Sequence, residues 1–591
     1  MNHDEVAKAL LGMAEALRTQ DPPKLKMAIK CARSTLKLET SEELTALCNF
    51  QLGKLLFFYT DNFELAKTHL QIAHAKMTPM GAFYTKEKLY AISMIADLYI
   101  HYQAWPLSPI KAALRHEIGT THGYPVLTYK LMFQLIELMK IDKDVKGAFE
   151  VCEIAINQCQ NDPKMELYFR ITKTLVTYQL MHDEPENAEV ARIGSMIKAL
   201  EGIPSERSHV ECIKDFFVCT KLSYMFYEGK SRTSRQLLRQ IQRAQWEQGP
   251  THGIRWLGET SMTVFACVLN IVSALVQSNS DRVEKYYYLL MKHADEILFK
   301  SARSPQEMGV VRCINMIKMT TLEMMACCNV MACRPQKALV NVQNMLEVSH
   351  RSSGPLLYRY FAPHMQYLLG LQSCYLREND AAEKHFLSAI KMFQKDGTNA
   401  ENTIALLNLN LAMTYLNQLK MAEYYDVAEN LTAPKIAGCS QMLKNNVKLL
   451  SAFFSYLTNK PNECRALVHE VLHESKAEDF FRLHGCALLL MSLIVTVDEQ
   501  GVKPTCDWSK KSHDHVMTVW SYNLYERIMM NNKCDLNSEV MRVIQAEQLE
   551  SKNALSVDTL VPQISNMQIS KLLQWFEGDP FKLLPRDETV L

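Results

Sequence analysis

The feature of this sequence that most restricts its fold is an internal repeat of paired helical patterns. In the segment "YLLGLQSCYLRENDAAEKHFLSAIKMF", Leu369-Gly370 is followed by Ala382, Phe386 and Ala389. This order of leucine-glycine, small, large and small residues is typical of the tetratricopeptide repeat (TPR), a hairpin of two helices. The glycine and alanines let the two helices approach closely, and Phe386 fills the space toward the next hairpin.

Related patterns recur along the chain. Two further segments carry the same positions, namely Leu52, Gly53, Ala66, Leu70 and Ala73, and then Leu135, Ala148, Cys152 and Ala155. In the second half, the first small position is assigned to Ala338, Ala382, Tyr424 and Ala466, at spacings of 44, 42 and 42 residues. A spacing of about 42 residues exceeds the 34 of a standard TPR, so the repeats are stretched and degenerate. We therefore expect an all-α protein, a right-handed α-solenoid (superhelix) of degenerate TPR-like helical hairpins.

Composition and hydropathy agree with a helical array. The 591 residues include only 20 glycines and 20 prolines, so helix breakers are rare. We expect residues 1–500 to form the TPR-like array and residues 501–591 to form a C-terminal helical cap and a short tail. The longest apolar run, residues 486–497, is too short to span a bilayer, so no membrane partner is expected. The 17 cysteines lack zinc-finger spacing and are expected to be reduced thiols.

The segment "ALVHEVLHES" contains the one motif that suggests an enzyme. His469 and His473 stand four residues apart, so one helical face could bring both to a zinc ion, with Glu470 as the general base of a metalloprotease. However, Ala466 at the small position of a repeat would put Glu470 at the large position and His473 at the second small position. The motif then lies inside a solenoid hairpin, without a sheet to build a protease site. We interpret it as a chance match and expect no catalytic residues, no metal and no cofactor, with a zinc metalloprotease as a remote alternative.

Two helical segments carry basic stripes. The residues involved are Lys26, Lys30, Arg33 and Lys37 in the first segment, and Arg232, Arg235, Arg239 and Arg243 in the second. Such stripes can contact an acidic peptide or a phosphate backbone, or they can be solvated helix faces. The formal net charge of the chain is +1, so we expect no strong direct binding to DNA.

Residues of the first helix of a TPR hairpin line its concave groove. Counted from Gly53 and Gly370, the predicted groove residues are Leu47, Phe50, Lys54 and Phe57, and His364, Tyr367 and Leu371. Aromatic groove residues suit an extended apolar peptide. The alternative is that they pack against other repeats. The last residues, "ETVL", also match a C-terminal PDZ ligand with Thr589 and Leu591 at the determining places, a match that is common by chance.

Several segments resemble the Mau-type chromatid cohesion factors, the TPR subunit of the cohesin loader. They are "ALLGMAEALRTQDPPK", "QLGKLLFFYTDNFELAKTHLQIA", "LMFQLIELMKIDKDVKGA" and "SKAEDFFRL". The resemblance covers about two thirds of the chain and is weak over residues 190–350 and after residue 500. His469 and His473 are not part of the family's pattern.

The resemblance implies a non-enzymatic adaptor in the nucleus, on chromatin, with the cytoplasm as a further location. As the partner it implies the large HEAT-repeat loader subunit, bound through that subunit's extended N-terminal segment. Together the two would act on cohesin and chromatin in sister-chromatid cohesion, chromosome segregation and development. A different TPR scaffold, such as a cytosolic chaperone or trafficking adaptor, is the alternative function, because periodicity by itself reaches only a helical-repeat protein that binds proteins.

Overall fold

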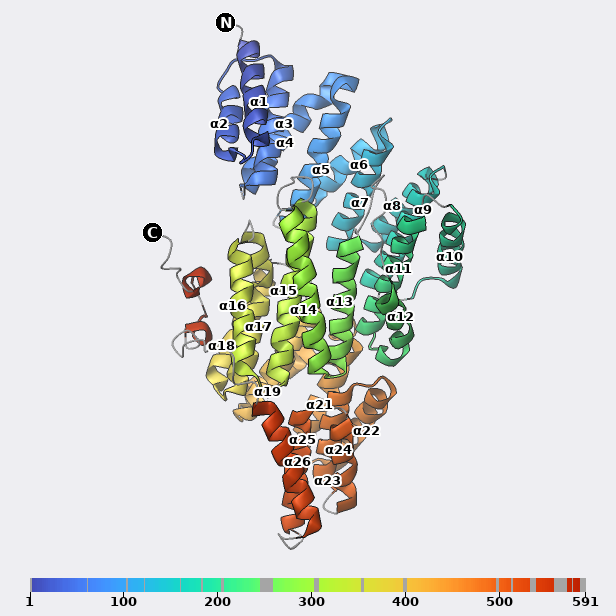
Figure 1. The fold of residues 1–591 in the computed structure, drawn as a ribbon, viewed down its shortest axis with the longest axis vertical. Helices are drawn as coiled ribbons and strands as arrows, with labels where there is room; N and C mark the ends of the chain where they lie inside the picture. The colour runs from blue at the N-terminus through green and yellow to red at the C-terminus, as the bar shows by residue number, and fades with distance from the viewer. Residues whose placement is uncertain are drawn as a thin grey trace.

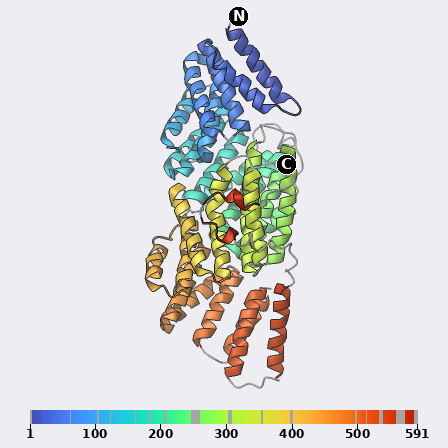
Figure 2. The ribbon, with the colours of Figure 1, turned by 90° about the vertical axis from the view of Figure 1, so that its left-hand side faces the viewer.

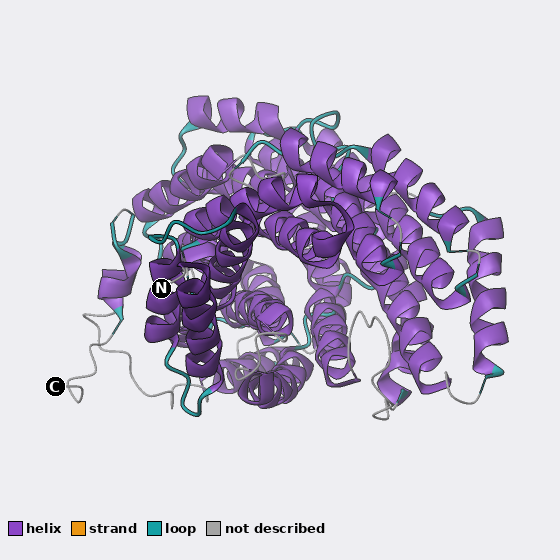
Figure 3. Cartoon of the chain, turned by 90° about the horizontal axis from the view of Figure 1, so that it is seen from above, coloured by secondary structure: helices purple, strands orange, loops and turns teal. Residues whose placement is uncertain are grey.

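The fold was determined as a computed structural model of the 591-residue chain. It describes residues 3–584, apart from 61, 103–104, 122, 160, 182–183, 204–206, 245–258, 302–307, 352–354, 397–400, 496–498, 512–513, 532–537, 557–570 and 577. Within these ranges the chain forms helices and short connections and no strand (Figure 3).

The helices follow one another along the whole chain. The first twelve span His3–Thr19 (α1), Leu25–Thr35 (α2), Glu42–Tyr59 (α3), Phe63–Met77 (α4), Thr85–Tyr102 (α5), Ser108–Thr120 (α6), Pro125–Ile141 (α7), Val145–Gln158 (α8), Pro163–Val176 (α9), Asn187–Glu201 (α10), Arg207–Tyr227 (α11) and Ser231–Arg243 (α12). The next seven span Glu259–Val276 (α13), Ser280–Ser301 (α14), Met308–Met331 (α15), Pro335–Arg351 (α16), Pro355–Tyr375 (α17), Asn379–Asp396 (α18) and Glu401–Asn417 (α19). The last seven span Met421–Ala428 (α20), Gln441–Leu457 (α21), Pro461–Ala477 (α22), Phe481–Val495 (α23), Glu499–Lys511 (α24), His515–Asn531 (α25) and Glu539–Ser556 (α26). Short 3₁₀ or π segments lie at Thr78–Tyr84 (η1), Thr177–Met181 (η2), Glu429–Leu431 (η4) and Pro580–Leu583 (η6).

Consecutive helices pair into hairpins that stack into an elongated superhelix (Figure 1). From α13 onward, each odd-numbered helix packs on its even-numbered partner and also on the next odd-numbered helix. The odd-numbered helices therefore form one continuous layer, and the even-numbered helices form a second layer beside it. Seen from above, the stack follows an arc (Figure 3). The predicted all-α superhelix of TPR-like hairpins is confirmed.

The small and large positions of the repeat account for how each hairpin closes. The alanines assigned to small positions in α4, α8 and α18 are completely buried. A Cβ on Gly53 would lie 2.8 Å from Cγ of Leu70, so α3 and α4 touch where the repeat pattern predicts. Five residues before the first small positions Ala148, Ala382 and Tyr424, the turn holds a residue with a left-handed backbone: Lys143 (φ 55°), Arg377 (φ 63°) and Leu419 (φ 59°). This recurring turn fixes the register of the hairpins.

In one hairpin, the register predicted from the sequence is wrong. Ala466, Glu470 and His473 are exposed on α22, whereas Cys464, Val468 and Val471 are completely buried. Asn459, with φ 59°, stands five residues before Cys464, as the turn rule requires. The small position is therefore Cys464, two residues earlier than assigned, and the polar residues never enter the core. The choice of alanine over cysteine caused the error, because a buried thiol also serves as a small apolar group.

The hairpins continue beyond residue 500. Helix α24 packs on α23 and α25, and α25 packs on α23 and α26, which repeats the arrangement of the preceding hairpins. We therefore propose that the array ends at Ser556, later than the boundary at residue 500 expected from the sequence.

Parts of the superhelix that are far apart in the sequence also contact each other. The first residues of α12 lie against the turn between α22 and α23. There, Nη2 of Arg235 lies 2.5 Å from Oδ2 of Asp479, and the backbone N–H of Arg232 donates to Oε2 of Glu478 over 3.0 Å. Lys143 and Glu401 form a further ion pair at 2.7 Å. These contacts join the first half of the chain to its last third.

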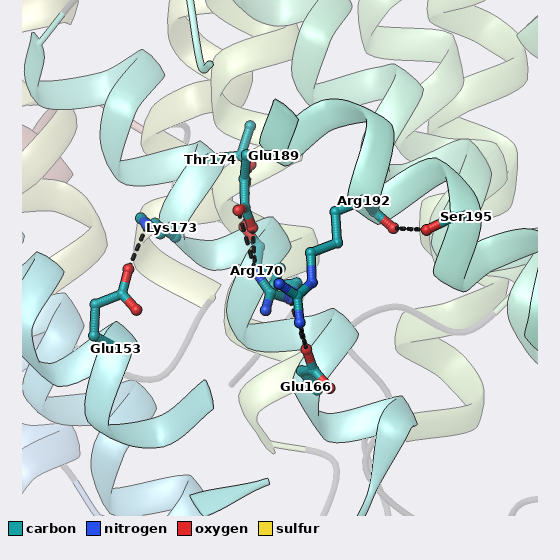
Figure 4. A network of polar contacts seen from close by, with 8 residues as sticks. All are labelled: Glu153, Glu166, Arg170, Lys173, Thr174, Glu189, Arg192 and Ser195. Carbon is teal, nitrogen blue, oxygen red and sulfur yellow. Dashed lines mark hydrogen bonds and ion pairs between the residues drawn. The ribbon is translucent and has the colours of Figure 1, made fainter. Parts of the chain in front are cut away.

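A buried ionic network holds α9 to α10 (Figure 4). Arg170 is 6% exposed, and its guanidinium donates to Glu166 and to Glu189, each over 2.8 Å. Arg192 adds a longer ion pair of 3.6 Å to Glu166. Removal of one carboxylate would leave the buried Arg170 guanidinium incompletely paired, which would destabilise the fold. We therefore assign this network a structural role.

Candidate protein-binding groove

An apolar groove of about 410 Å³ runs across four odd-numbered helices, α19, α21, α23 and α25. Its walls consist mainly of leucine, methionine and aromatic side chains, and they are Leu409, Asn410, Met413, Asn446, Leu449, Leu450, Phe453, Cys486, Leu489, Leu490, Leu493 and Trp520. Trp520 is 51% exposed, and Met413 and Leu493 are 39% and 40% exposed. Large apolar side chains exposed together in a groove are typical of a surface that receives another chain.

The groove follows the repeat. The buried small residue that corresponds to Gly370 is Ala412 in α19, Ala452 in α21 and Ser492 in α23. Groove residues lie three residues before and one residue after this position in each helix: Leu409 and Met413, Leu449 and Phe453, Leu489 and Leu493. These are the offsets that placed Tyr367 and Leu371 in a predicted groove. The signal was therefore present in the sequence, but the glycine that marks the position is replaced in the later repeats.

The lining of this groove is mainly apolar and uncharged. Its lining residues include no carboxylate, imidazole, ammonium or guanidinium group. Burial raises the pKa of the Cys486 thiol to about 11, so the thiol is protonated at neutral pH and is a poor nucleophile. Two amides, Asn410 and Asn446, are the polar groups that can meet a peptide backbone.

The groove residues predicted in α3 lie in a different environment. Phe50 and Phe57 are each 6% exposed and belong to the N-terminal core. The guanidinium carbon of Arg312, from α15, lies 5.5 Å from the centre of the Phe57 ring. Leu47 is partly buried, and Lys54 is exposed. In this structure the two rings are therefore core residues, as in the alternative interpretation, and Lys54 is the member of the set that faces solvent.

The residues predicted in α17 are also mostly covered. His364 Nδ1 lies 2.9 Å from Oε1 of Glu323 on α15, and Tyr367 is 8% exposed. Burial raises the pKa of Tyr367 well above its usual range, so its hydroxyl stays neutral. Leu371 is partly buried. The two predicted sets lie on different hairpins, and neither set lines the apolar groove on α19–α25.

The two basic stripes differ in their surroundings. Lys26, Lys30, Arg33 and Lys37 are exposed on and just after α2, and no ion pair joins them to another residue that the structure describes. In the second stripe, Arg232 and Arg235 contact the turn between α22 and α23. Arg239 and Arg243 line a cavity together with Lys214 and the carboxylates of Glu211 and Asp215. Half of the second stripe thus contacts a distant hairpin, and the other half lies in a cavity with two carboxylates and one lysine.

The histidine motif lies on the exposed face of α22. His469 and His473 point away from the core, and Glu470 forms an ion pair of 3.2 Å with Lys448. Among the described residues, no group of three or more histidine, cysteine or acidic side chains is arranged to hold a metal ion. Thr589 and Leu591 of the C-terminal "ETVL" lie outside the described residues. None of the described helices combines the length and apolarity that a membrane span requires.

The fold defines a helical-repeat protein of the TPR type, and it carries an apolar groove on α19, α21, α23 and α25. Comparison with known proteins narrows this class. The sequence profile of the cohesin loading factors matches residues 6–533. The chain is 71% identical to Maternal uncoordinated protein 2 of Caenorhabditis elegans over 594 residues, which cover 100% of both chains. The MAU2 chromatid cohesion factor homolog of Drosophila virilis is 21% identical over 97% of this chain and 92% of its own length.

This chain belongs to the cohesin loading factor family, and its role is in cohesin loading. The family consists of non-catalytic adaptors. The solved structure of the APC/C hetero-tetramer Cut9-Hcn1 aligns with 97% of this chain and 96% of its own chain, with 8% identity and a TM-score of 0.38.

Proposed function

We propose that this protein is the adaptor subunit of a cohesin-loading complex and holds an extended segment of the large HEAT-repeat loader subunit. The observation that carries the proposal is the apolar groove on α19, α21, α23 and α25, in a chain that belongs to the cohesin loading factors. A groove that repeats the same offsets on successive helices suits a partner that runs along them as an extended chain. The partner's N-terminal segment is the occupant that the family resemblance implies.

The energetics favour a long contact. An extended segment loses conformational entropy when it becomes ordered, so many side chains must be buried to offset that loss. Trp520 and Leu493 can supply anchors, because both have exposed apolar surface that a partner would cover. In this account, the adaptor and the large subunit together place cohesin on chromatin in the nucleus and serve sister-chromatid cohesion and chromosome segregation.

Contact with chromatin is expected to be indirect. The exposed lysines and arginine of the α2 stripe are the main basic surface that could contact DNA. In the α12 stripe, Arg235 is paired with Asp479, and Arg239 and Arg243 line a cavity that contains carboxylates. We therefore expect the isolated chain to bind duplex DNA no better than typical non-specific binding, with a Kd of about 1 μM or weaker at physiological salt. A titration followed by fluorescence anisotropy tests this point, and tighter, salt-sensitive binding would contradict it.

The experiment that tests the proposal is co-purification from nuclear extract with tagged full-length protein. The wild-type chain should recover the large HEAT-repeat loader subunit. The double variant Leu493→Glu/Trp520→Glu should lose most of it, because two charges would be placed in an apolar contact. The matched control is Val543→Glu/Leu549→Glu, which changes residues that are 53% and 60% exposed on α26. Recovery of the subunit by the groove variant at the control level would refute the groove as the partner site.

A further inference from the structure

A segment near the C-terminus lies against hairpins that precede it by about 200 residues. Helix α26 ends at Ser556, and after residues 557–570 the described chain resumes at Lys571 beside α16, α17 and α18 (Figures 1 and 2). Leu572, Leu573 and Trp575 are only 3–6% exposed and join the core cluster of these hairpins. We call residues 571–584 the C-terminal segment.

Side chains of the array recognise the backbone of this segment. Nε2 of His385 donates to the carbonyl oxygen of Leu573 over 2.8 Å, and the amide of Gln366 donates to the carbonyl oxygen of Trp575 over 3.1 Å. The hydroxyl of Ser388 lies 3.5 Å from the carbonyl oxygen of Phe576. Leu573 is the last residue of the helical stretch 571–573, and Trp575 and Phe576 follow it; the last carbonyls of a helix lack intrahelical partners. The array thus supplies donors to carbonyl groups at and just after the end of this helical stretch.

Two of the donors occupy unusual positions. His385 and Gln366 are completely buried, at 0% exposed each, and Nδ1 of His385 lies 2.6 Å from Oε1 of Gln366. Buried polar side chains in a repeat core are costly unless their partners are present. Without the C-terminal segment, both side chains would lose the carbonyl that they contact. This pair is therefore arranged as a receptor for a peptide backbone.

Aromatic contacts complete the recognition. The Phe576 ring lies 4.6 Å from the His385 ring, centre to centre, and Nζ of Lys384 lies 5.5 Å from the centre of the Phe576 ring. Further along, the Phe581 ring packs 4.9 Å from His350 on α16 and 5.2 Å from Tyr358 on α17. The segment is thus read by its Leu-Leu-x-Trp-Phe pattern and by a second aromatic anchor five residues later.

We propose that the surface formed by α16, α17 and α18 is a second peptide-binding site, distinct from the groove on α19–α25, and that its occupant is the chain's own C-terminal segment. The segment acts as a ligand held in cis and is separated from the array by the 14 residues 557–570. Its contacts with the array are those of a bound peptide: apolar anchors, capped carbonyls and tilted ring contacts. A peptide with the same leucine and aromatic pattern, presented in trans, competes for the same site.

The test uses the full chain with a protease recognition sequence inserted between residues 560 and 561. After cleavage, the fragment that carries the C-terminal segment should remain bound and co-elute with the array in gel filtration. An excess of a fluorescent synthetic peptide of residues 568–586 should then displace the fragment and bind with a saturable rise in anisotropy. The peptide with Trp575→Ala should bind at least tenfold more weakly. The peptide with Lys582→Ala, at an exposed position, should bind like the wild-type peptide.

Three results would overturn the proposal. The fragment could leave the cleaved protein at once, which would mean that the segment has no affinity of its own. It could resist displacement until the protein unfolds, which would make it an integral part of the core. Equal binding of the Trp575→Ala and wild-type peptides would show that the site does not read the aromatic anchor.

Discussion

The ring of Phe386 on α18 lies directly against Gly370 on α17, at a place where a Cβ on the glycine would be 2.4 Å from Cε1 of the ring. The repeat pattern predicts this contact, because it places a glycine on the first helix opposite a large side chain on the second helix. It sets the distance between the two helices of the hairpin, and the hairpin in turn sets the direction of the next one. The position of the groove on the hairpins that follow, from α19 to α25, depends on such contacts.

The first prediction concerns this contact. Gly370→Ala should lower the free energy of unfolding by about 1–3 kcal/mol, because the added methyl group collides with a buried ring in a filled core. Chemical denaturation followed by circular dichroism measures the change. Gly12→Ala is the matched control: it lies inside α1 with no atom within 4 Å of the added methyl, so it should be neutral or stabilising. Equal effects of the two changes would contradict the packing described for the hairpin.

The second prediction concerns the turns. Leu419 has φ 59° and is 74% exposed, so its side chain strains the backbone without contributing to the core. Leu419→Gly should therefore stabilise the protein by about 0.5–1 kcal/mol. The same change at Leu549, which is 60% exposed inside α26, should destabilise by about 1 kcal/mol. Thermal melts of the two variants should shift in opposite directions, and a destabilised Leu419→Gly variant would count against the turn geometry.

The sequence predicts contacts between residues of one hairpin, but it does not predict contacts between residues that are far apart in the chain. Contacts within a hairpin, such as Gly53 against Leu70, recur at fixed offsets and are readable from the pattern. The apolar groove on α19–α25 follows the same offsets. However, Ala412 and Ala452 occupy the position at which a glycine would have identified the first helix of the repeat. The burial of Phe57 beneath Arg312 is not readable, because it depends on how far the superhelix winds before α15 passes α3. The pitch is a sum of many small rotations, and no local motif encodes it.

The third prediction concerns the contact between Arg235 and Asp479, which are separated by 244 residues. This pair joins α12 to the turn between α22 and α23, which lies within the "SKAEDFFRL" segment. The segment therefore has a structural role. Arg235→Gln and Asp479→Asn should each destabilise the protein, and the double variant should show a coupling energy of about 0.5–1 kcal/mol, as expected for a partly exposed pair. Asparagine is chosen because it tolerates the left-handed backbone of position 479. Arg239→Gln is the control that should show no coupling to Asp479→Asn, and a coupling energy of zero for the pair would remove its structural role.

The fourth prediction concerns pH. Burial, together with the positive charge of Lys476, lowers the pKa of His484 to about 4, whereas the unfolded chain has a histidine pKa near 6.5. Between these values the unfolded state binds more protons, so the free energy of unfolding should fall as the pH drops from 6.5 to 4, by up to about 3 kcal/mol from this residue. Urea titrations across that range should give a flatter profile for His484→Phe than for wild type. His473→Gln, at an exposed position, should keep the wild-type profile, and an unchanged slope in His484→Phe would contradict the assignment.

The central claim is that the groove on α19–α25 holds an extended segment of the large loader subunit, and site-specific photo-crosslinking tests it most directly. A benzophenone amino acid at Met413, inside the groove, should form a covalent adduct with the N-terminal segment of that subunit in the purified complex, and peptide mapping should locate the adduct there. The same probe at Leu549, exposed on α26, serves as the control and should form no such adduct. Adducts of equal yield at both positions, or an intact complex without an adduct at Met413, would contradict the account.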